Sequence, residues 1–169
     1  YNDPSVLFIS THQQGIYPGT GAINDTGVGK GVGFNINVPL MGGHGDASYA
    51  AIFEQIVWPA ALRFEPEMIL VSAGFDAHWD DPLAGIHLSL SGYAHLTREL
   101  VRMANQLCGG KIAFIVEGGY NLDVLSEGVA NIARVLLGEE TVDPLGASPY
   151  SERTGVENVI ARVKQVHGL

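Results

Sequence analysis

An acidic segment in the middle of the chain offers the strongest candidate for chemistry. Residues 68–73 are apolar and predict a buried strand, and Asp76 and His78 follow that strand. A carboxylate at the end of a buried strand is a hard oxygen ligand that suits a divalent metal ion, and His78 could share its face. The alternative is that Asp76, or Asp81 further along, caps a turn. The spacing alone does not decide between these two interpretations.

A second candidate is Tyr120 in the segment EGGYN, residues 117–121. Two glycines allow a sharp turn that would hold the phenol at the end of another apolar segment. A phenol in that place could donate a hydrogen bond to a developing oxyanion. Taken alone, the segment favours a plainer interpretation, in which Tyr120 fills the loop and bonds to backbone groups.

Two other common kinds of site do not match the sequence. Residues 27–31 are glycine-rich, but Lys30 is followed by Gly31 and then by a predicted strand from Phe34, so the phosphate-binding G-x-x-x-x-G-K-[ST] pattern is not met. No G-x-S-x-G elbow of a serine hydrolase is present. Ser10 and His12 follow a short apolar segment and are expected to form a hydrogen-bonded strand end.

Composition narrows the classes of function. The 169 residues carry a formal charge of −9, which disfavours direct binding to nucleic acid or to an anionic membrane. Cys108 is the single cysteine, which excludes a disulfide scaffold and a cysteine-rich zinc module. The sequence shows neither an apolar run of 18 residues nor a basic leader, so a cytoplasmic location is expected.

The order of elements predicts an α/β fold with a parallel sheet. Strands are expected at 6–9, 34–38, 68–73 and 112–116. Helices are expected from a cap at Asp46 to about Arg63 with Pro59 bending or ending it, from a cap at Ser91 to 108, over 123–137, and over 152–167 after a connector at 138–151. The loops 10–33, 74–90 and 117–121 would then share the carboxyl edge of the sheet, where such folds bind ligands.

Together these segments resemble the zinc-dependent histone deacetylase superfamily, which includes bacterial acetylpolyamine amidohydrolases. The matching stretches are STHQQGIYPGTG (10–21), GVGKGVGFNINVPL (27–40), SAGFDAHWDDPLAG (72–85) and EGGYN (117–121). Their form is closer to class II and bacterial members. The resemblance implies a three-layer arginase/deacetylase-like fold, with a parallel sheet flanked by helices, and residues 1–169 as the carboxyl-terminal portion of one such domain.

The resemblance also implies roles for individual residues. Asp76 would be a zinc ligand and Tyr120 the donor to the transition state in hydrolysis of an acetyl amide to acetate and a free amine. Ser10 and the carbonyl of Thr11 would belong to a potassium site. The remaining implied positions are a second monovalent-cation site at Asp3, Val6 and Phe34, a channel wall at Tyr17, a channel floor at Gly118 and Gly119, and a rim at Leu83.

The same resemblance implies that the site is incomplete in this chain. Two further zinc ligands from an Asp-x-His segment and a His-His pair for the general base match nothing here. We expect a sheet cut along one edge, completed by a longer parent chain, by a separate amino-terminal half, or by homo-oligomerisation. The alternatives to an amidohydrolase are a non-catalytic binding or scaffold module and a two-metal enzyme of the arginase branch. Acetyl-lysine, acetylated polyamines and other small acetylated amines remain open as substrates, and zinc and iron(II) as the metal.

Overall fold

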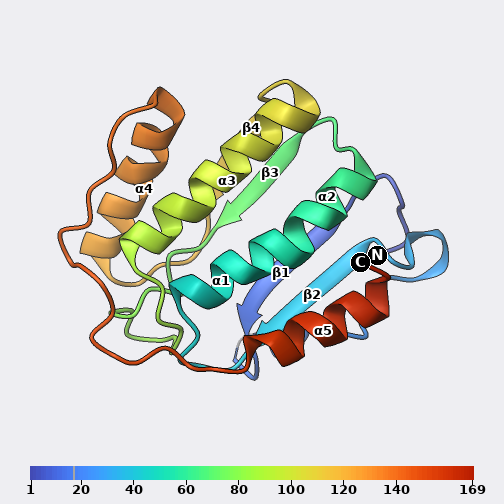
Figure 1. Cartoon of the computed structure of the whole chain (residues 1–169), viewed down its shortest axis with the longest axis horizontal. Coiled ribbons are helices and arrows are strands. Elements are labelled where there is room, and N and C mark those ends of the chain that lie inside the picture. Colours follow the sequence, from blue (N-terminus) through green and yellow to red (C-terminus); the bar gives the residue numbers. More distant parts are fainter. Residues whose placement is uncertain (17) are drawn as a thin grey trace.

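A computed structural model describes residues 1–16 and 18–169 (Figure 1). Its strands are β1 (Phe8–Gln13), β2 (Asn35–Leu40), β3 (Ile69–Ala73) and β4 (Ile112–Val116). Its helices are the 3₁₀ turn η1 (Gly29–Gly31), α1 (Asp46–Ile52), the π-helical turn η2 (Phe53–Val57), α2 (Trp58–Phe64), α3 (Leu90–Cys108), α4 (Leu122–Leu137) and α5 (Val156–His167). The predicted alternation of strands and helices is therefore confirmed.

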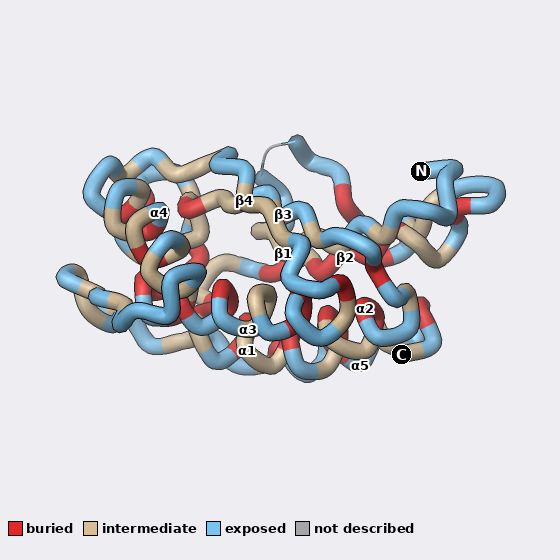
Figure 2. Tube along the Cα trace, turned by 90° about the horizontal axis from the view of Figure 1, so that it is seen from above, coloured by how far each residue is buried: buried red, intermediate tan, exposed pale blue. Residues whose placement is uncertain are grey.

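The strands form two parallel pairs. β1 pairs with β2 from Phe8↔Asn35 to Gln13↔Leu40, and β3 pairs with β4 from Ile69↔Ile112 to Ala73↔Val116. In Figures 1 and 2 the strands lie side by side in the order β4, β3, β1, β2, and all four run in the same direction. The described residues place no hydrogen-bonded strand between β3 and β1. The expected cut along one edge of the sheet is therefore wrong, because the sheet is divided in its middle.

The first two strands are longer than the sequence predicts. β1 begins at Phe8 and continues to Gln13, beyond the predicted end at residue 9, and Ser10 and His12, expected to form a hydrogen-bonded strand end, lie within it. β2 includes Pro39, which was expected to close it. Proline is tolerated there because its nitrogen faces the outer edge of β2, where the ladder to β1 needs no N–H donor.

Two predicted helix caps are wrong, because a distant side chain bonds the first turn of α1 and a neighbouring serine caps α3. Asp46 lies in the first turn of α1, and its carboxylate accepts hydrogen bonds from the N–H and hydroxyl of Ser89. The first turn of α1 is instead bonded by Glu152, whose carboxylate accepts from the N–H groups of Ala47 and Ser48 at 3.2 and 2.7 Å. Ser89 rather than Ser91 caps α3, since its hydroxyl accepts from Gly92 N–H.

The remaining helix ends follow local chemistry. Pro59 lies in the first turn of α2, where a missing N–H is tolerated, and α2 ends at Phe64. Glu65 then adopts a left-handed conformation with φ of 55°. α5 begins at Val156 and not at 152, because Gly155 adopts a left-handed conformation and Glu152 is engaged with α1. The predicted connector contains no helix or strand in the described structure.

The main core lies between the strands and one layer of helices. Figure 2 shows α1, α2, α3 and α5 on the same side of the strands. Inward-facing residues of β2 pack against these helices, and Ile36, Val38 and Leu40 are fully buried. A smaller cluster of Phe75, Leu90 and Val124 joins α3 and α4. Burying this apolar surface fixes the helices and therefore the strand ends that carry the polar loops.

Candidate functional site

Asp76 lies three residues beyond the carboxyl end of β3, in a space that two glycines leave open. A Cβ atom on Gly74 would lie 2.9 Å from Asp76 Oδ1, and a Cβ atom on Gly118 would lie 3.1 Å from Asp76 Cγ. Gly118 belongs to the loop after β4, so two adjacent strand ends shape this space. The arrangement places a half-buried carboxylate at the carboxyl edge of the sheet, as the sequence predicts for a metal ligand.

The surroundings of Asp76 disfavour its charged form. Burial is the largest cause and raises the pKa of Asp76 above its ordinary value, and the nearby Asp81 carboxylate raises it further. No positive group of the described residues is among the causes that set the pKa of Asp76. A bound cation would supply a positive charge, which is why this position suits a metal ligand.

We expect Asp76→Asn to raise the melting temperature of the metal-free chain at pH 7. Because folding raises the pKa of Asp76, protonation of this carboxyl group stabilises the folded chain. That stabilisation is complete below the unfolded-state pKa and is lost as the pH rises through the folded-state pKa. The neutral amide avoids this loss. Melting curves of both proteins in chelator from pH 4 to 8 should therefore show a gain that shrinks as the pH falls. A gain that is constant over this range would show that the titration of Asp76 is not its cause.

Tyr120 is positioned by Asp81 through the protein backbone. The N–H of Tyr120 donates to Asp81 Oδ2 at 2.9 Å, and the phenol side chain is 57% exposed. The other oxygen of Asp81 accepts from the N–H groups of Leu83 and Ala84 at 2.9 and 3.2 Å. The predicted turn role is therefore confirmed for Asp81. This buried carboxylate also joins the loops after β3 and β4, which the sequence analysis did not foresee.

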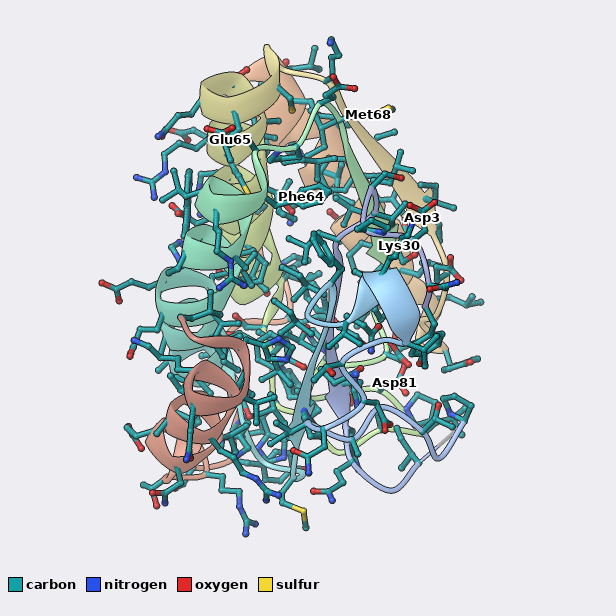
Figure 3. All side chains as sticks on the ribbon, turned by 90° about the vertical axis from the view of Figure 1, so that its right-hand side faces the viewer. Asp3, Lys30, Phe64, Glu65, Met68 and Asp81 are labelled. Carbon is teal, nitrogen blue, oxygen red and sulfur yellow. The ribbon has the colours of Figure 1, made fainter. Side chains whose placement is uncertain are left out.

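A second contact fastens the same two loops. Asn121 Nδ2 donates to the carbonyl of Asp80 at 3.1 Å and to its carboxylate at 2.9 Å. The side-chain oxygen of Asn121 accepts from Asp123 and Val124 N–H and so caps α4. Tyr120 therefore lies between a loop fixed by Asp81 and a helix fixed by its cap. In Figure 3, Asp81 lies at the opposite end of the strands from Met68, which precedes β3.

Asp81→Asn is expected to destabilise the chain by about 1–3 kcal/mol, because the amide nitrogen cannot accept the backbone hydrogen bonds that a carboxylate oxygen accepts. Urea unfolding followed by circular dichroism measures this cost. Asp80→Asn is the matched control in the same loop, because Asp80 is exposed and its side chain accepts from Asn121 alone. Equal costs for both variants would contradict the joining role of Asp81.

His78 does not share the face of Asp76. Its side chain is fully buried, its ring lies 5.2 Å from that of Trp79, and its Nδ1 accepts the N–H of Asp80 at 3.1 Å. Burial lowers the pKa of His78 below its ordinary value. The described residues contain no group of three or more His, Cys, Asp or Glu side chains arranged to hold a metal ion.

Ser10 is held in β1 by a histidine two residues along. His12 Nε2 lies 3.1 Å from the carbonyl oxygen of Gly21, so this nitrogen must carry the proton. His12 Nδ1 then accepts the Ser10 hydroxyl proton at 2.9 Å. This tautomer leaves the lone pairs of Ser10 Oγ free, which agrees with the oxygen ligand that a potassium ion would need.

The other predicted site residues fall into separate places. Val6 and Phe34 precede β1 and β2, at the opposite end of the strands from Asp76, and the carbonyl of Phe34 accepts Phe8 N–H at 2.9 Å. The Asp3 carboxylate accepts the N–H and hydroxyl of Ser5. Gly119 has a φ of 127°, and Leu83 is exposed beside the Asp81 turn. Tyr17 lies outside the described residues.

A cleft of about 540 Å³ connects Ser10 with Asp76. Its walls are β1 and β3, and its floor is made of α1 and α3 side chains that include Tyr49, Tyr93 and Leu96. Tyr49 is buried and Tyr93 is partly buried. Their hydroxyl groups lie close enough to Asp76 for its charge to raise the pKa of both phenols, after burial as the larger cause.

Comparisons with known proteins agree with the geometry. The model of the histone deacetylase domain matches residues 1–136. The chain is 47% identical to histone deacetylase 14, chloroplastic, of Arabidopsis thaliana, over 99% of this chain and 40% of that protein. It is 44% identical to a probable deacetylase of Archaeoglobus fulgidus, over 73% of this chain and 34% of that protein.

Solved structures give the same result for the fold. The crystal structure of the HDA15 HD domain superposes with a TM-score of 0.81 at 37% identity, over 96% of this chain and 43% of that one. The histone deacetylase Clr3 superposes with a TM-score of 0.85 at 34% identity, over 98% and 28%. The chain thus spans about two fifths of the plant relative and less of several others. Among the described residues, no helix is long and apolar enough to cross a membrane.

Proposed function

Because the chain belongs to the histone deacetylase family, we propose that it forms the carboxyl-terminal part of a zinc-dependent hydrolase that converts an acetyl amide to acetate and a free amine. The observation that carries the proposal is the joining of Asp76 and Tyr120 at one sheet edge. The glycine-lined space holds the carboxylate, and Asp81 fastens the loop of Tyr120 to the loop of Asp76.

Each residue has a distinct task in this proposal. Asp76 would hold the metal, which when bound polarises the acetyl carbonyl and lowers the pKa of a water molecule. Tyr120 would donate its hydroxyl proton in a hydrogen bond to the oxyanion of the tetrahedral intermediate. Asp81 acts through the backbone of Tyr120 and is a positioning residue. Ser10 and the Thr11 carbonyl would hold potassium.

The proposed site needs residues beyond those described. A catalytic zinc site takes three protein ligands and an open position, and Asp76 supplies one of them. The other ligands and the general base would come from the rest of a deacetylase domain, in a longer chain or a separate one. The substrate class is an acetylated amine, either acetyl-lysine or an acetylated polyamine. The negative charge of the chain would attract cationic amines in general and does not distinguish between these substrates.

A non-catalytic scaffold is the second candidate, and the lack of a three-ligand cluster among the described residues favours it. A two-metal site of the arginase branch fits less well, because it needs several clustered Asp and His ligands. The bacterial type and the cytoplasmic location stay predictions. Two plant relatives bear the word chloroplastic in their names.

Hydrolysis assays with two forms of the protein test the proposal. The chain alone, and the chain purified with the part of the Arabidopsis relative outside the matched region, would be supplied with zinc and offered an acetyl-lysine peptide and an acetylated polyamine. We expect acetate release by the complex only, and its loss on chelation. A stable complex that binds zinc yet releases no acetate would support the scaffold instead.

A further inference from the structure

Phe75 lies next to both parts of the candidate site. It directly precedes Asp76 in the chain, and its backbone N–H donates to the carbonyl of Gly118 at 2.9 Å. Its side chain is 2% exposed, although it belongs to a loop at the carboxyl edge of the sheet. A buried, close-packed ring cannot move without its neighbours, so it fixes the backbone that carries it.

One side of this ring rests on a glycine inside a helix. Gly128 is buried in the middle of α4. A Cβ atom on Gly128 would overlap Cε1 of Phe75 and would lie 2.5 Å from Cδ1 and 2.9 Å from Cζ of the same ring. Glycine is a poor helix former compared with alanine, because it loses more conformational freedom when the helix forms. The space that the Phe75 ring needs explains why a glycine lies at this position of α4.

A second side of Phe75 lies against the loop that carries Tyr120. A Cβ atom on Gly119 would lie 3.0 Å from Phe75 Cβ and 3.5 Å from its Cα. The φ of 127° at Gly119 is a conformation that residues with a side chain rarely adopt. Gly119 directly precedes Tyr120, so the backbone next to Tyr120 packs directly on the residue next to Asp76.

The other neighbours of the ring are side chains of α3 and α4, two helices that lie side by side (Figure 1). Leu90 and Val124 form a buried cluster with Phe75, and the ring of Tyr93 lies 5.1 Å from the Phe75 ring. We call the surroundings of the ring the Phe75 slot, which is made of Gly119, Gly128, Leu90, Val124 and Tyr93. Because the slot is packed on several sides, a change in its depth must displace the Phe75 ring and the backbone attached to it.

We infer that Phe75 and Gly128 are positioning residues that set the spacing between Asp76 and Tyr120. The inference rests on the proposed function, in which Asp76 holds the metal and Tyr120 donates to the oxyanion. Asp81 holds the two loops together by hydrogen bonds, whereas the Phe75 side chain keeps them a fixed distance apart. Groups that act together on one substrate must be held to within about 0.5 Å, and a rigid spacer in a packed slot provides that precision.

Gly128→Ala tests the depth of the slot with a single added methyl group. At an open helix position this substitution stabilises a protein, but here the new methyl group must displace the Phe75 ring. Phe75→Leu removes the ring atoms Cε1 and Cζ, so the double variant with Phe75→Leu and Gly128→Ala regains the space. Ser126→Ala is the matched control, because Ser126 is exposed on the same helix.

Amide ¹H–¹⁵N spectra of the chain alone provide the structural measurement. We expect Gly128→Ala to shift the amide resonances of Asp76 and Tyr120, the double variant to bring them back toward the wild-type positions, and Ser126→Ala to leave them in place. Unshifted resonances in a folded Gly128→Ala chain would overturn the inference. If Gly128→Ala does not fold, Phe75→Leu alone decides, because it shortens the spacer without changing α4 and should shift the same two resonances.

Steady-state kinetics of the chain in complex with the remaining part of the Arabidopsis relative, with zinc and an acetyl-lysine peptide, provide the functional measurement. We expect Gly128→Ala to lower kcat by about tenfold or more, because small displacements of reacting groups are costly, and the double variant to recover part of this loss. KM should stay within about twofold, since the spacing acts on the transition state. A kcat for Gly128→Ala equal to that of Ser126→Ala would overturn the inference. A wild-type complex that releases no acetate would instead refute the proposed function, and the amide resonances would still decide whether the slot positions the two loops.

Discussion

Replacing Tyr120 by phenylalanine is expected to lower kcat for acetyl-amide hydrolysis by about 10²–10³-fold in the complete enzyme, which is the usual cost of losing one oxyanion donor. The substitution removes only the hydroxyl group. The backbone N–H of Tyr120 continues to donate to Asp81, so the loop should keep its conformation. KM should change little, because the hydroxyl acts on charge that develops after the substrate binds.

The measurement is steady-state kinetics of the complex with an acetyl-lysine peptide, together with a melting temperature for each variant. Tyr150→Phe is the matched control, because Tyr150 stacks on His87 at 5.0 Å in the carboxyl-terminal segment and lines no part of the cleft. Full turnover by Tyr120→Phe would remove Tyr120 from the catalytic step. If Tyr120→Phe lowers the melting temperature so far that the enzyme is unfolded in the assay, the loss of activity would indicate a structural role.

Replacing Asp76 by asparagine is expected to reduce the zinc content of the complex from near one per protomer to near zero after exhaustive dialysis. A neutral amide is a poor zinc ligand, and the two residues beside the carboxylate, Gly74 and Gly118, carry no side chain that could replace it. Activity should fall in parallel. The chain alone is expected to hold little zinc, since the described residues offer no three-ligand cluster.

Metal content by atomic emission and activity in the same samples provide the measurement. Asp80→Asn is the control in the same loop, because its carboxylate is exposed and bonds to Asn121. Zinc retained by Asp76→Asn would show that Asp76 is not a ligand. One zinc per protomer in the chain alone would show that Asp76 finds its partner ligands within this chain or in a second copy.

Most of the secondary structure could be predicted because it depends on local chemistry. The apolar segment between Lys111 and Glu117 forms β4 with the predicted bounds, and glycine ends α3 and α4 at 109 and 138 as local propensity requires. The caps of α1 and α3 could not be predicted in the same way. Asp46 and Ser91 are good local candidates, but Glu152, 104 residues from Ser48, bonds the first turn of α1, and Ser89, two residues before Ser91, caps α3.

The candidate site also has residues that the sequence predicts and residues that it does not. The sequence predicts Asp76 and Tyr120 in polar loops after apolar strands, because the apolar segments 68–73 and 112–116 are each followed by polar and glycine residues. It did not reveal Asp81 as the carboxylate that joins these loops, since the residue whose N–H it accepts, Tyr120, lies 39 positions further along the chain. The sequence suggested that His78 could share the face of Asp76, but the His78 side chain is fully buried.

The sequence by itself thus determined the family, the order of elements and the two residues that we assign to chemistry, since these follow from local motifs and hydrophobic patterning. Only the tertiary structure decided how the sheet is divided. Strand pairing joins segments distant along the chain, and the pairing of β1 with β2 and of β3 with β4 carries no signature in residue type. Backbone hydrogen-bonding direction depends on register, and register is fixed only when the strands meet in space.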